Sequence, residues 1–199
     1  TCKQPIKESY LLTGELEKTN DAYAIAKIAG IKMCENYNIQ YKTNYKCLMP
    51  TNTFGPNDNY DALNSHFLPA LIKKVHDLRL NNKKELILWG NGLAKREVIY
   101  VDDLADACIF FMKKNFFGTT INIGSGKDFS IKEYAKKILN IILPKKKIKI
   151  KYDLSKPNGT PRKVLDIKLA NKYGWRPKTK LDVAIKKTYR NFLENNKIV

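Results

Sequence analysis

Residues 17–30 read Glu17-Lys-Thr-Asn-Asp-Ala-Tyr-Ala-Ile-Ala-Lys-Ile-Ala-Gly30, and they open a long stretch with helical spacing. Apolar side chains recur every three or four residues from position 22 to about position 41, which predicts an α-helix over that range. Asn20 or Asp21 is expected to cap its first turn, because short polar side chains accept hydrogen bonds from the free backbone N–H groups there.

A phenol and an ammonium share one face of this predicted helix. Tyr23 and Lys27 are four residues apart, and such residues are neighbours on a helix surface. A positive charge beside a phenol favours the phenolate, so the pair is suited to proton exchange near neutral pH. The spacing by itself is weak, because 11 tyrosines and 32 lysines give about two such pairs by chance, and two are present. The second, Tyr152 and Lys156, precedes Pro157 and is not expected within a helix. An ordinary surface pair remains the alternative for the first.

Beyond this helix, strand and helix patterns alternate along the chain. Strands are expected at 45–49, 85–89, 97–101, 120–123 and 147–152, and helices at 66–80, 102–114 and 130–142, with two short helices on either side of 174–177. Ser130 and Glu133 have capping-box spacing, and Asp102 is expected to cap the helix that follows it. Loops rich in Asn, Pro and Gly are expected at 51–65 and 158–161. The alternation indicates an α/β protein.

The composition is that of a folded, strongly basic protein. The 199 residues are 43% hydrophobic, which argues against disorder, and carry a net charge of +18. That charge comes from 32 lysines and five arginines, whereas proteins that read nucleic-acid bases favour the bidentate arginine side chain. A solvated lysine surface is therefore preferred, and no nucleic-acid partner is expected. A basic protein also suits an anionic substrate such as a nucleotide sugar.

The cysteines and the hydropathy argue against several other classes. Cys2, Cys34, Cys47 and Cys108 have no metal-ligand spacing, so neither a zinc site nor a disulfide framework is expected. The last three lie in helix or strand patterns and are expected to be small core residues. Reduced thiols fit the cytoplasm, and no apolar run reaches the roughly 18 residues of a membrane span. We therefore expect a cytoplasmic protein with neither a metal centre nor a membrane partner.

One glycine pattern is missing from the sequence. None of the ten glycines forms GxGxxG or GxxGxxG after a strand, although an α/β protein that binds a dinucleotide normally carries such a turn in its first βαβ unit. The phosphate-binding half of such a domain is therefore expected upstream of Thr1.

Several motifs together carry a family resemblance. Besides residues 17–30, they are Met49-Pro-Thr-Asn-Thr-Phe-Gly-Pro56, Asn64-Ser-His66, Leu68-Pro-Ala-Leu71, Trp89-Gly-Asn-Gly92, Arg96-Glu97, Val101-Asp-Asp103, Ile121-Asn-Ile-Gly124 and Ser155-Lys-Pro-Asn-Gly-Thr-Pro-Arg-Lys163. In this order they resemble the extended short-chain dehydrogenases/reductases, and within them the GDP-L-fucose synthase family of GDP-4-keto-6-deoxy-D-mannose 3,5-epimerase/4-reductases. The resemblance covers nearly the whole chain. It implies the C-terminal portion of an NAD(P)-binding Rossmann fold plus a smaller α/β substrate-binding domain.

The resemblance also implies how the chain divides into domains and which partners it binds. Residues 1–60 would be the remainder of the dinucleotide-binding domain, to which residues of about 94–125 return, and residues 61–199 would mainly form the substrate-binding domain. Such enzymes are usually homodimers that pair through a helix bundle containing the tyrosine-bearing helix. A homodimer with a GDP-sugar substrate is therefore expected.

Three residues would carry the chemistry that the resemblance implies. Tyr23 would give a proton to the oxygen of the ketone at carbon 4 while NADPH delivers hydride, and Lys27 would ease deprotonation of the phenol and bind the nicotinamide ribose. His66 matches the family's histidine that exchanges protons at carbons 3 and 5, and imidazole titrates in the useful range. A capping or core histidine is the alternative for His66. The family's catalytic Ser and Cys are expected upstream of Thr1, because Cys2 does not match that cysteine.

The resemblance assigns two further sets of residues to ligands. The nicotinamide end of NADP(H) would be held at the carboxyl end of a strand, where ligands bind in open α/β sheets, by Lys27, Pro50, Thr51, Asn52, Thr53 and His66. The GDP-sugar would be bound by Lys74, Trp89, Arg96, Asn158 and Lys163. Arginine can fork onto a diphosphate, and the indole offers a flat face to a sugar or base. Lys74 and Asn158 depart from family members that carry Arg and Asp at these positions. The ordinary alternatives are an Asn/Pro turn, solvated cations and a core tryptophan.

Two other functions stay open. Another extended short-chain enzyme that acts on a nucleotide sugar, such as a 4-epimerase or a 4,6-dehydratase, would share Tyr23 and Lys27 without needing His66 as an acid or base. A non-catalytic basic protein that binds nucleic acid would show an affinity that falls steeply with salt.

Overall fold

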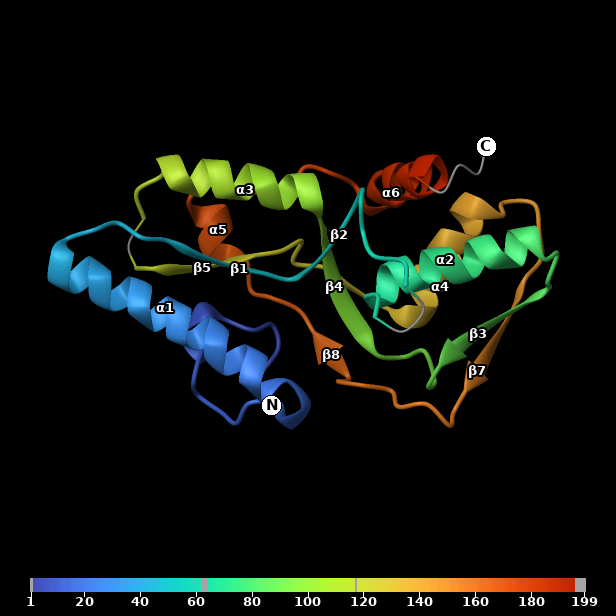
Figure 1. Ribbon diagram of the computed structural model, residues 1–199, viewed down its shortest axis with the longest axis horizontal. Coiled ribbons are helices and arrows are strands. Elements are labelled where there is room, and N and C mark those ends of the chain that lie inside the picture. Colours follow the sequence, from blue (N-terminus) through green and yellow to red (C-terminus); the bar gives the residue numbers. More distant parts are fainter. Residues whose placement is uncertain (1, 62–63, 117, 196–199) are drawn as a thin grey trace.

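The computed structural model describes residues 2–61, 64–116 and 118–195, whose elements form two groups joined by a central strand (Figure 1). The first group contains α1 (Asp21–Tyr41), β1 (Cys47–Pro50), α3 (Val101–Lys113), β5 (Thr120–Ile123) and α5 (Lys168–Lys172). The second contains α2 (Phe67–Leu80), β3 (Glu85–Trp89), α4 (Ile131–Ile142), β7 (Lys149–Asp153) and α6 (Leu181–Asn195). The central strand β4 (Lys95–Tyr100) is accompanied by β2 (Asn52–Phe54), β6 (Asp128–Ser130) and β8 (Arg162–Lys163).

The first group is built on a parallel pair of strands. β1 pairs with β5 in the register Cys47 to Thr120 and Pro50 to Ile123. Helix α3 buries Phe111 against this pair, and the Trp175 ring fills the same core after α5. The Trp175 indole N–H donates a hydrogen bond to Asp106 Oδ2 on α3 at 3.0 Å. Burial of these aromatic rings fixes α3 and α5 to the strands.

Strand β4 connects the two groups. It pairs in parallel with β2 and with β8, and its first half pairs antiparallel with β6. The side chains from Glu97 to Tyr100 are all buried, because other parts of the chain cover both faces of the strand. A strand in this position brings the start of the second group next to the ends of β1 and β2.

The second group has the larger apolar core. β3 and β7 pair in parallel, and β3 alternates, with Leu86 and Leu88 buried and the three residues around them exposed. Helices α2, α4 and α6 pack on this core with the residues Leu68, Leu71, Ile72, Val75, Tyr134, Ile138, Ile185 and Phe192. The alternation of β3 is that of a strand with one wet face.

Helix α1 differs from every other long helix of the described chain. None of its 21 residues is buried. Its large apolar side chains that remain exposed are Tyr23, Ile25, Met33, Tyr37, Ile39 and Tyr41. Two short 3-10 helices precede it, η1 (Glu8–Tyr10) and η2 (Lys18–Asn20), and Figure 1 shows α1 running along the side of the first group.

Ser130 caps α4 as predicted and Asp102 does not cap α3, while of the two candidates at α1 it is Asp21 that accepts a backbone hydrogen bond, from the Ala22 N–H at 2.6 Å. The Ser130 side chain accepts a hydrogen bond from the Glu133 backbone N–H, and the Glu133 carboxylate accepts one from the Ser130 backbone N–H, which completes a capping box for α4. Asn20 stands at the N-cap of α1 but its side chain makes no capping bond, because its backbone adopts φ −138° and ψ 16°, away from the extended conformation usual at this position. Helix α3 begins at Val101, so Asp102 lies inside its first turn rather than at the cap.

The α/β class and the predicted long elements are confirmed, while three short strands were missed. β2 lies in the segment 51–65 that was predicted as a loop, and β6 and β8 are three and two residues long. Strands of this length contain no measurable alternation, so only their pairing with β4 defines them. The last helix, α6, has 15 residues and is longer than predicted. Cys108 is exposed rather than in the core, whereas Cys34 and Cys47 are half-buried.

No helix within the described part of the chain combines the length and the apolar character required to cross a bilayer.

Candidate active site

The Tyr23 and Lys27 side chains are neighbours on the surface of α1, as their spacing predicts. The Lys27 Nζ atom lies 5.3 Å from the centroid of the Tyr23 ring, and both residues are exposed. The turn before the helix is held by Glu17, whose carboxylate accepts hydrogen bonds from the Thr19 backbone N–H and from its hydroxyl. These bonds are the main reason why the pKa of Glu17 lies below its usual value. The first turn of α1 thus presents a phenol with a cation beside it.

Residues 50–53 lie at the carboxyl end of β1, where the sequence predicted the nicotinamide. They are more regular than the predicted turn, because Asn52–Phe54 form β2. The Thr51 backbone N–H donates to the Ile123 carbonyl oxygen at 2.9 Å, and the Thr51 hydroxyl donates to the Glu97 carbonyl oxygen at 3.2 Å. The Thr51 hydroxyl therefore ties β1 to the central strand. Pro50 remains exposed at the strand end.

A cavity of about 240 Å³ lies beside Pro50, between the strand ends and the N-terminal segment. Its lining includes Met49, Pro50, Asn122 and the residues Cys2, Ile6, Tyr10, Leu12, Glu15 and Leu165. Asn122 holds the segment in place, since its backbone N–H donates to Glu8 Oε1 and its side-chain amide to the Ile6 carbonyl oxygen, both at 2.9 Å. No motif in the sequence assigns residues 6–16 to a site. Their position depends on these long-range hydrogen bonds, which no local pattern reveals.

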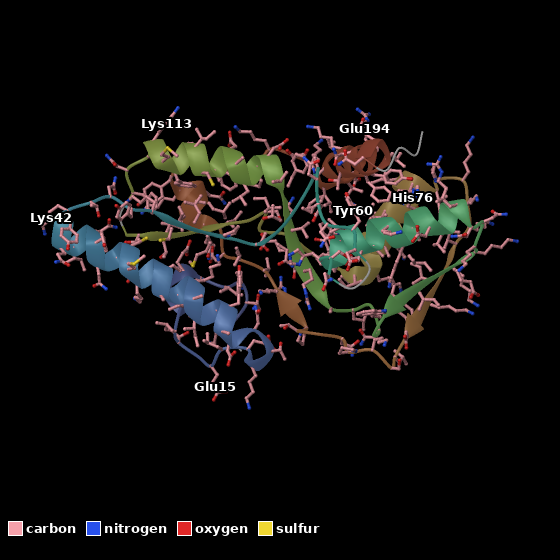
Figure 2. The ribbon with its side chains drawn as sticks, viewed as in Figure 1. Glu15, Lys42, Tyr60, His76, Lys113 and Glu194 are labelled. Atoms are coloured by element: carbon pink, nitrogen blue, oxygen red, sulfur yellow. The ribbon has the colours of Figure 1, made fainter. Side chains whose placement is uncertain are left out.

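His66 is neither a capping nor a core histidine. It occupies the N-cap position of α2, but its side chain makes no capping hydrogen bond and is exposed. The preceding turn is held by Asp61, whose side chain accepts a hydrogen bond from the Asn64 backbone N–H at 2.8 Å. The buried histidine of the chain is His76, which the sequence did not single out (Figure 2). Both ordinary alternatives for His66 are therefore wrong, and its proton-exchange role stays a prediction.

Lys74 and Trp89 meet at the end of β3. The Lys74 Nζ atom lies 5.2 Å from the centroid of the Trp89 ring, close enough for a cation–π contact. The ring is 57% exposed, so the predicted alternative of a core tryptophan is wrong. Partial burial lowers the pKa of Lys74, and the nearby Asp153 carboxylate opposes that shift. An exposed indole beside an ammonium is suited to an anionic ligand that carries an aromatic base.

Asn158 joins the loop after β7 to the turn after β3. Its Oδ1 atom accepts a hydrogen bond from the Asn91 backbone N–H at 2.8 Å. Gly90 has φ +62°, and a Cβ atom there would lie 2.4 Å from the same oxygen, so only glycine allows this approach. The side chain of Asn158 thus has a structural use next to Trp89.

Arg96 and Lys163 are neighbours across β4 and β8. They occupy paired positions in the parallel register, and Lys163 follows the loop that contains Asn158. The Arg96 Nη1 atom donates to the carbonyl oxygens of Lys95 and Thr160. Partial burial lowers the pKa of Arg96. The charge of Lys163 also lowers the pKa of Glu17, by less than the hydrogen bonds from Thr19 do.

Glu97 is a buried carboxylate that the sequence did not identify as important. It is 1% exposed and accepts hydrogen bonds from the backbone N–H groups of Gly126 and of Leu165, the latter at 2.7 Å. Burial raises the pKa of Glu97, and these hydrogen bonds oppose the increase. A Cβ atom on Gly124 would lie 2.4 Å from its Oε1 atom. Glu97 thus joins the segments around 125 and 165 beneath Arg96.

Within the described residues, no group of three or more His, Cys, Asp or Glu side chains is arranged to hold a metal ion. The predicted glycine-rich turn and the catalytic Ser and Cys concern the chain before Thr1 and lie outside the described residues.

The α/β fold and the Tyr23–Lys27 pair are accompanied by a match to a known protein family. A family profile described as "NAD dependent epimerase/dehydratase family" matches residues 1–124. The chain belongs to the NAD dependent epimerase/dehydratase family.

Several proteins of known name are similar to this chain in sequence or in structure. The chain is 47% identical over 192 residues to "Putative GDP-L-fucose synthase 2" of Arabidopsis thaliana, a match that covers 96% of this chain and 58% of the relative. It is 44% identical over 202 residues to "GDP-L-fucose synthase" of Escherichia coli (strain K12), covering 97% of this chain and 62% of the relative. A solved structure of a GDP-L-fucose synthetase from Naegleria fowleri bound to NADP has a TM-score of 0.86 and 26% identity, over 98% of this chain and 63% of that one. The chain thus spans about three fifths of the length of these curated relatives.

Proposed function

We propose that the protein acts as a GDP-L-fucose synthase, which converts GDP-4-keto-6-deoxy-D-mannose to GDP-L-fucose by 3,5-epimerisation and NADPH-dependent reduction of the 4-ketone. The observation that carries the proposal is the contact of Tyr23 with Lys27 on α1, which is accompanied by an exposed indole beside an ammonium group at Trp89 and Lys74. The names of the relatives that match 96–97% of the chain support the same substrate. They favour this activity over a nucleotide-sugar 4-epimerase or 4,6-dehydratase, and over a nucleic-acid-binding protein.

The cavity of about 240 Å³ beside Pro50 is smaller than the roughly 300–1,000 Å³ typical of small-molecule pockets, and of the predicted cofactor residues its lining includes Pro50. Lys27, Pro50, Thr51, Asn52, Thr53 and His66 would hold the nicotinamide and its ribose. When bound, NADPH would supply the hydride that reduces the ketone.

In the reduction step, Tyr23 would donate its phenolic proton to the ketone oxygen as negative charge develops there. Lys27, with its Nζ atom 5.3 Å from the ring centroid, would stabilise the resulting phenolate. Both side chains are exposed on α1, so a ligand has access to them.

In the epimerisation steps, the ketone acidifies the C–H bonds at carbons 3 and 5, so a base can remove each proton and an acid can return one on the opposite face. His66 would serve as one of these groups, because its imidazole is exposed and makes no capping bond. Its place at the start of α2 puts it on the helix that also carries Lys74.

The GDP moiety would bind at the second cluster, to which five segments contribute residues. Lys74 and Trp89 come from α2 and β3, Arg96 from β4, and Asn158 and Lys163 from the loop before β8 and from β8 itself. Cations at this density suit a diphosphate, and the exposed indole face suits a planar base or a sugar ring.

We also propose that the protein is a cytoplasmic homodimer that pairs through α1. Besides Tyr23, five large apolar side chains of α1 are exposed, and a monomeric protein rarely leaves so much apolar surface of one helix uncovered. Residues up to about 60 and from about 94 to 125 would serve the cofactor, and the remainder would mainly bind the substrate.

The test uses the purified protein from its complete reading frame, with GDP-4-keto-6-deoxy-D-mannose and NADPH. We expect GDP-L-fucose as the product and, in deuterated water, isotope incorporation at carbons 3 and 5. Tyr23→Phe should lower kcat for reduction by about 10²–10⁴-fold while leaving isotope incorporation, and His66→Asn should abolish incorporation. Tyr152→Phe, at the other Tyr-x-x-x-Lys match, is the control and should change neither. Normal epimerisation and normal reduction by the His66 variant would contradict the assignment.

A further inference from the structure

Lys156 shares the Trp89 ring with Lys74, although neither the motifs nor the proposed function gives it a role. The Lys156 Nζ atom lies 5.7 Å from the centroid of the indole, and that of Lys74 lies 5.2 Å away. The two lysines come from the loop after β7 and from the middle of α2. The fold therefore brings two ammonium groups to one side chain that is itself 57% exposed.

The loop that carries Lys156 is firmly attached to its surroundings. The Lys156 backbone N–H donates to the Asp153 carbonyl oxygen at 3.3 Å, which closes a turn directly after β7. Two residues later, Asn158 accepts the hydrogen bond from Asn91, and the Thr160 carbonyl oxygen accepts one from Arg96. Asn91 lies in the turn directly after Trp89, and Arg96 lies on the next strand, β4. Lys156 thus projects from a braced loop at the edge of the proposed nucleotide site.

Among residues 2–61, 64–116 and 118–195, neither Lys74 nor Lys156 forms an ion pair with a carboxylate. Asp153, whose charge interacts with both lysines, accepts two hydrogen bonds from Ser155, at 2.6 Å from its hydroxyl and 3.1 Å from its backbone N–H. Those bonds are the main cause of its lowered pKa, and the charges of Lys156 and Lys74 add to the shift. Two like charges beside one ring repel each other, and a multivalent anion between them would relieve that repulsion.

We propose that Lys156 is a substrate-binding residue that, together with Lys74, holds the diphosphate of the nucleotide sugar next to Trp89. This inference rests on the proposed function, and it extends that site by one cation. Lys156 acts as a specificity determinant, because a diphosphate with two negative groups gains from both lysines and an uncharged nucleoside gains from neither.

The test compares GDP with guanosine by titration calorimetry on the purified protein and its variants. Lys156→Gln keeps most of the aliphatic stem on the indole but removes the charge. We expect about a tenfold loss of affinity for GDP, the size of one charge-assisted hydrogen bond, and no change for guanosine. Lys156→Arg should restore GDP binding to within about threefold, because it restores the charge. In turnover assays the Gln variant should raise KM and leave kcat unchanged.

Lys151→Ala is the matched control. Lys151 lies five residues earlier on β7 and forms an ion pair with Glu85 at 2.8 Å, away from the Trp89 ring. Its removal should leave GDP affinity within about twofold of the unmodified protein. Circular dichroism and thermal unfolding of each variant report whether the loop and the fold are intact.

The outcomes separate this inference from the function on which it rests. If Lys156→Gln binds GDP as tightly as the unmodified protein, or loses GDP and guanosine affinity equally, Lys156 does not bind the diphosphate. If the unmodified protein binds no GDP at all, the proposed function is wrong and this inference falls with it. A GDP-specific loss that Lys156→Arg reverses supports both.

Discussion

Helix α1 and the pair α2 and α4 differ in what supports them. α2 buries seven residues and α4 buries five, whereas α1, with 21 residues, buries none. Most of the stability of a helix in a protein comes from the packing of one face, so α2 and α4 depend on the core and α1 does not. The helix that carries Tyr23 and Lys27 is therefore the least embedded long helix of the described chain. Length alone does not anchor a helix.

The largest expected effect comes from truncating a buried residue of α4. Truncation of an exposed residue of α1 serves as the comparison. Ile138 is fully buried, so Ile138→Ala should lower the free energy of unfolding by about 2–5 kcal/mol. Ile25 is 57% exposed within one protomer, so Ile25→Ala should change the free energy of unfolding of the monomer by less than about 0.5 kcal/mol. Urea denaturation of both variants, at a protein concentration that keeps the chain monomeric, measures the difference. A similar loss at the two positions in the monomer would contradict the exposed position of α1.

A smaller effect is expected from the caps. Ser130→Ala removes the capping box of α4 and should cost about 1 kcal/mol of unfolding free energy. Asn20→Ala in α1 removes a side chain that makes no capping bond, so its effect should stay below about 0.3 kcal/mol. Thermal unfolding of the two variants checks this. An equal loss would show that Asn20 caps α1 after all.

The buried helix pair also contains a titratable group, His76 on α2. It is 1% exposed, and its Nδ1 atom lies 2.9 Å from the Tyr189 hydroxyl on α6. Burial lowers the pKa of His76, with Arg79 and Lys73 acting in the same direction and Asp77 opposing them.

The folded state therefore binds fewer protons at His76 than the unfolded state, whose histidine pKa is about 6.5. The resulting stability is fully present above that value and is lost as the pH falls through it. Between pH 7 and pH 6 the loss is at most about 0.7 kcal/mol. Urea denaturation at both pH values, with His76→Phe as the reference that lacks this titration, measures it. A protein that gains stability relative to that reference on acidification would contradict the assignment.

The smallest expected effect comes from removing surface ion pairs, which should lower the free energy of unfolding by similar small amounts on α1 and on α2. Lys32 and Glu35 pair at 2.7 Å on α1, and Lys73 and Asp77 pair at 3.0 Å on α2. Glu35→Gln and Asp77→Asn should each cost less than about 0.5 kcal/mol, because both pairs are solvated. Raising the salt concentration should remove the difference in unfolding free energy between each variant and the unmodified protein. A loss well above this value for Glu35→Gln alone would indicate that the pair is shielded from solvent.

Local patterns were sufficient for the long elements and for part of the site. The period of 3.6 residues locates α1 and α2 to within one or two residues, and the spacing of Ser130 and Glu133 identifies the start of α4. The contact between Tyr23 and Lys27 follows from helix geometry, and so did not require a tertiary structure. These features depend on residues that lie within a few positions of one another, and such relations are readable in any sequence.

The tertiary structure alone decided the features that join distant segments. Glu97 accepts the Leu165 backbone N–H 68 residues away, and β2 and β8 exist as strands only because β4 lies beside them. Likewise, Lys156 reaches Trp89 because separate hydrogen bonds brace the loop between β7 and β8. A hydrogen bond or a charge contact between remote residues leaves no period in the sequence, because it is formed only when packing of the whole chain brings the two segments together.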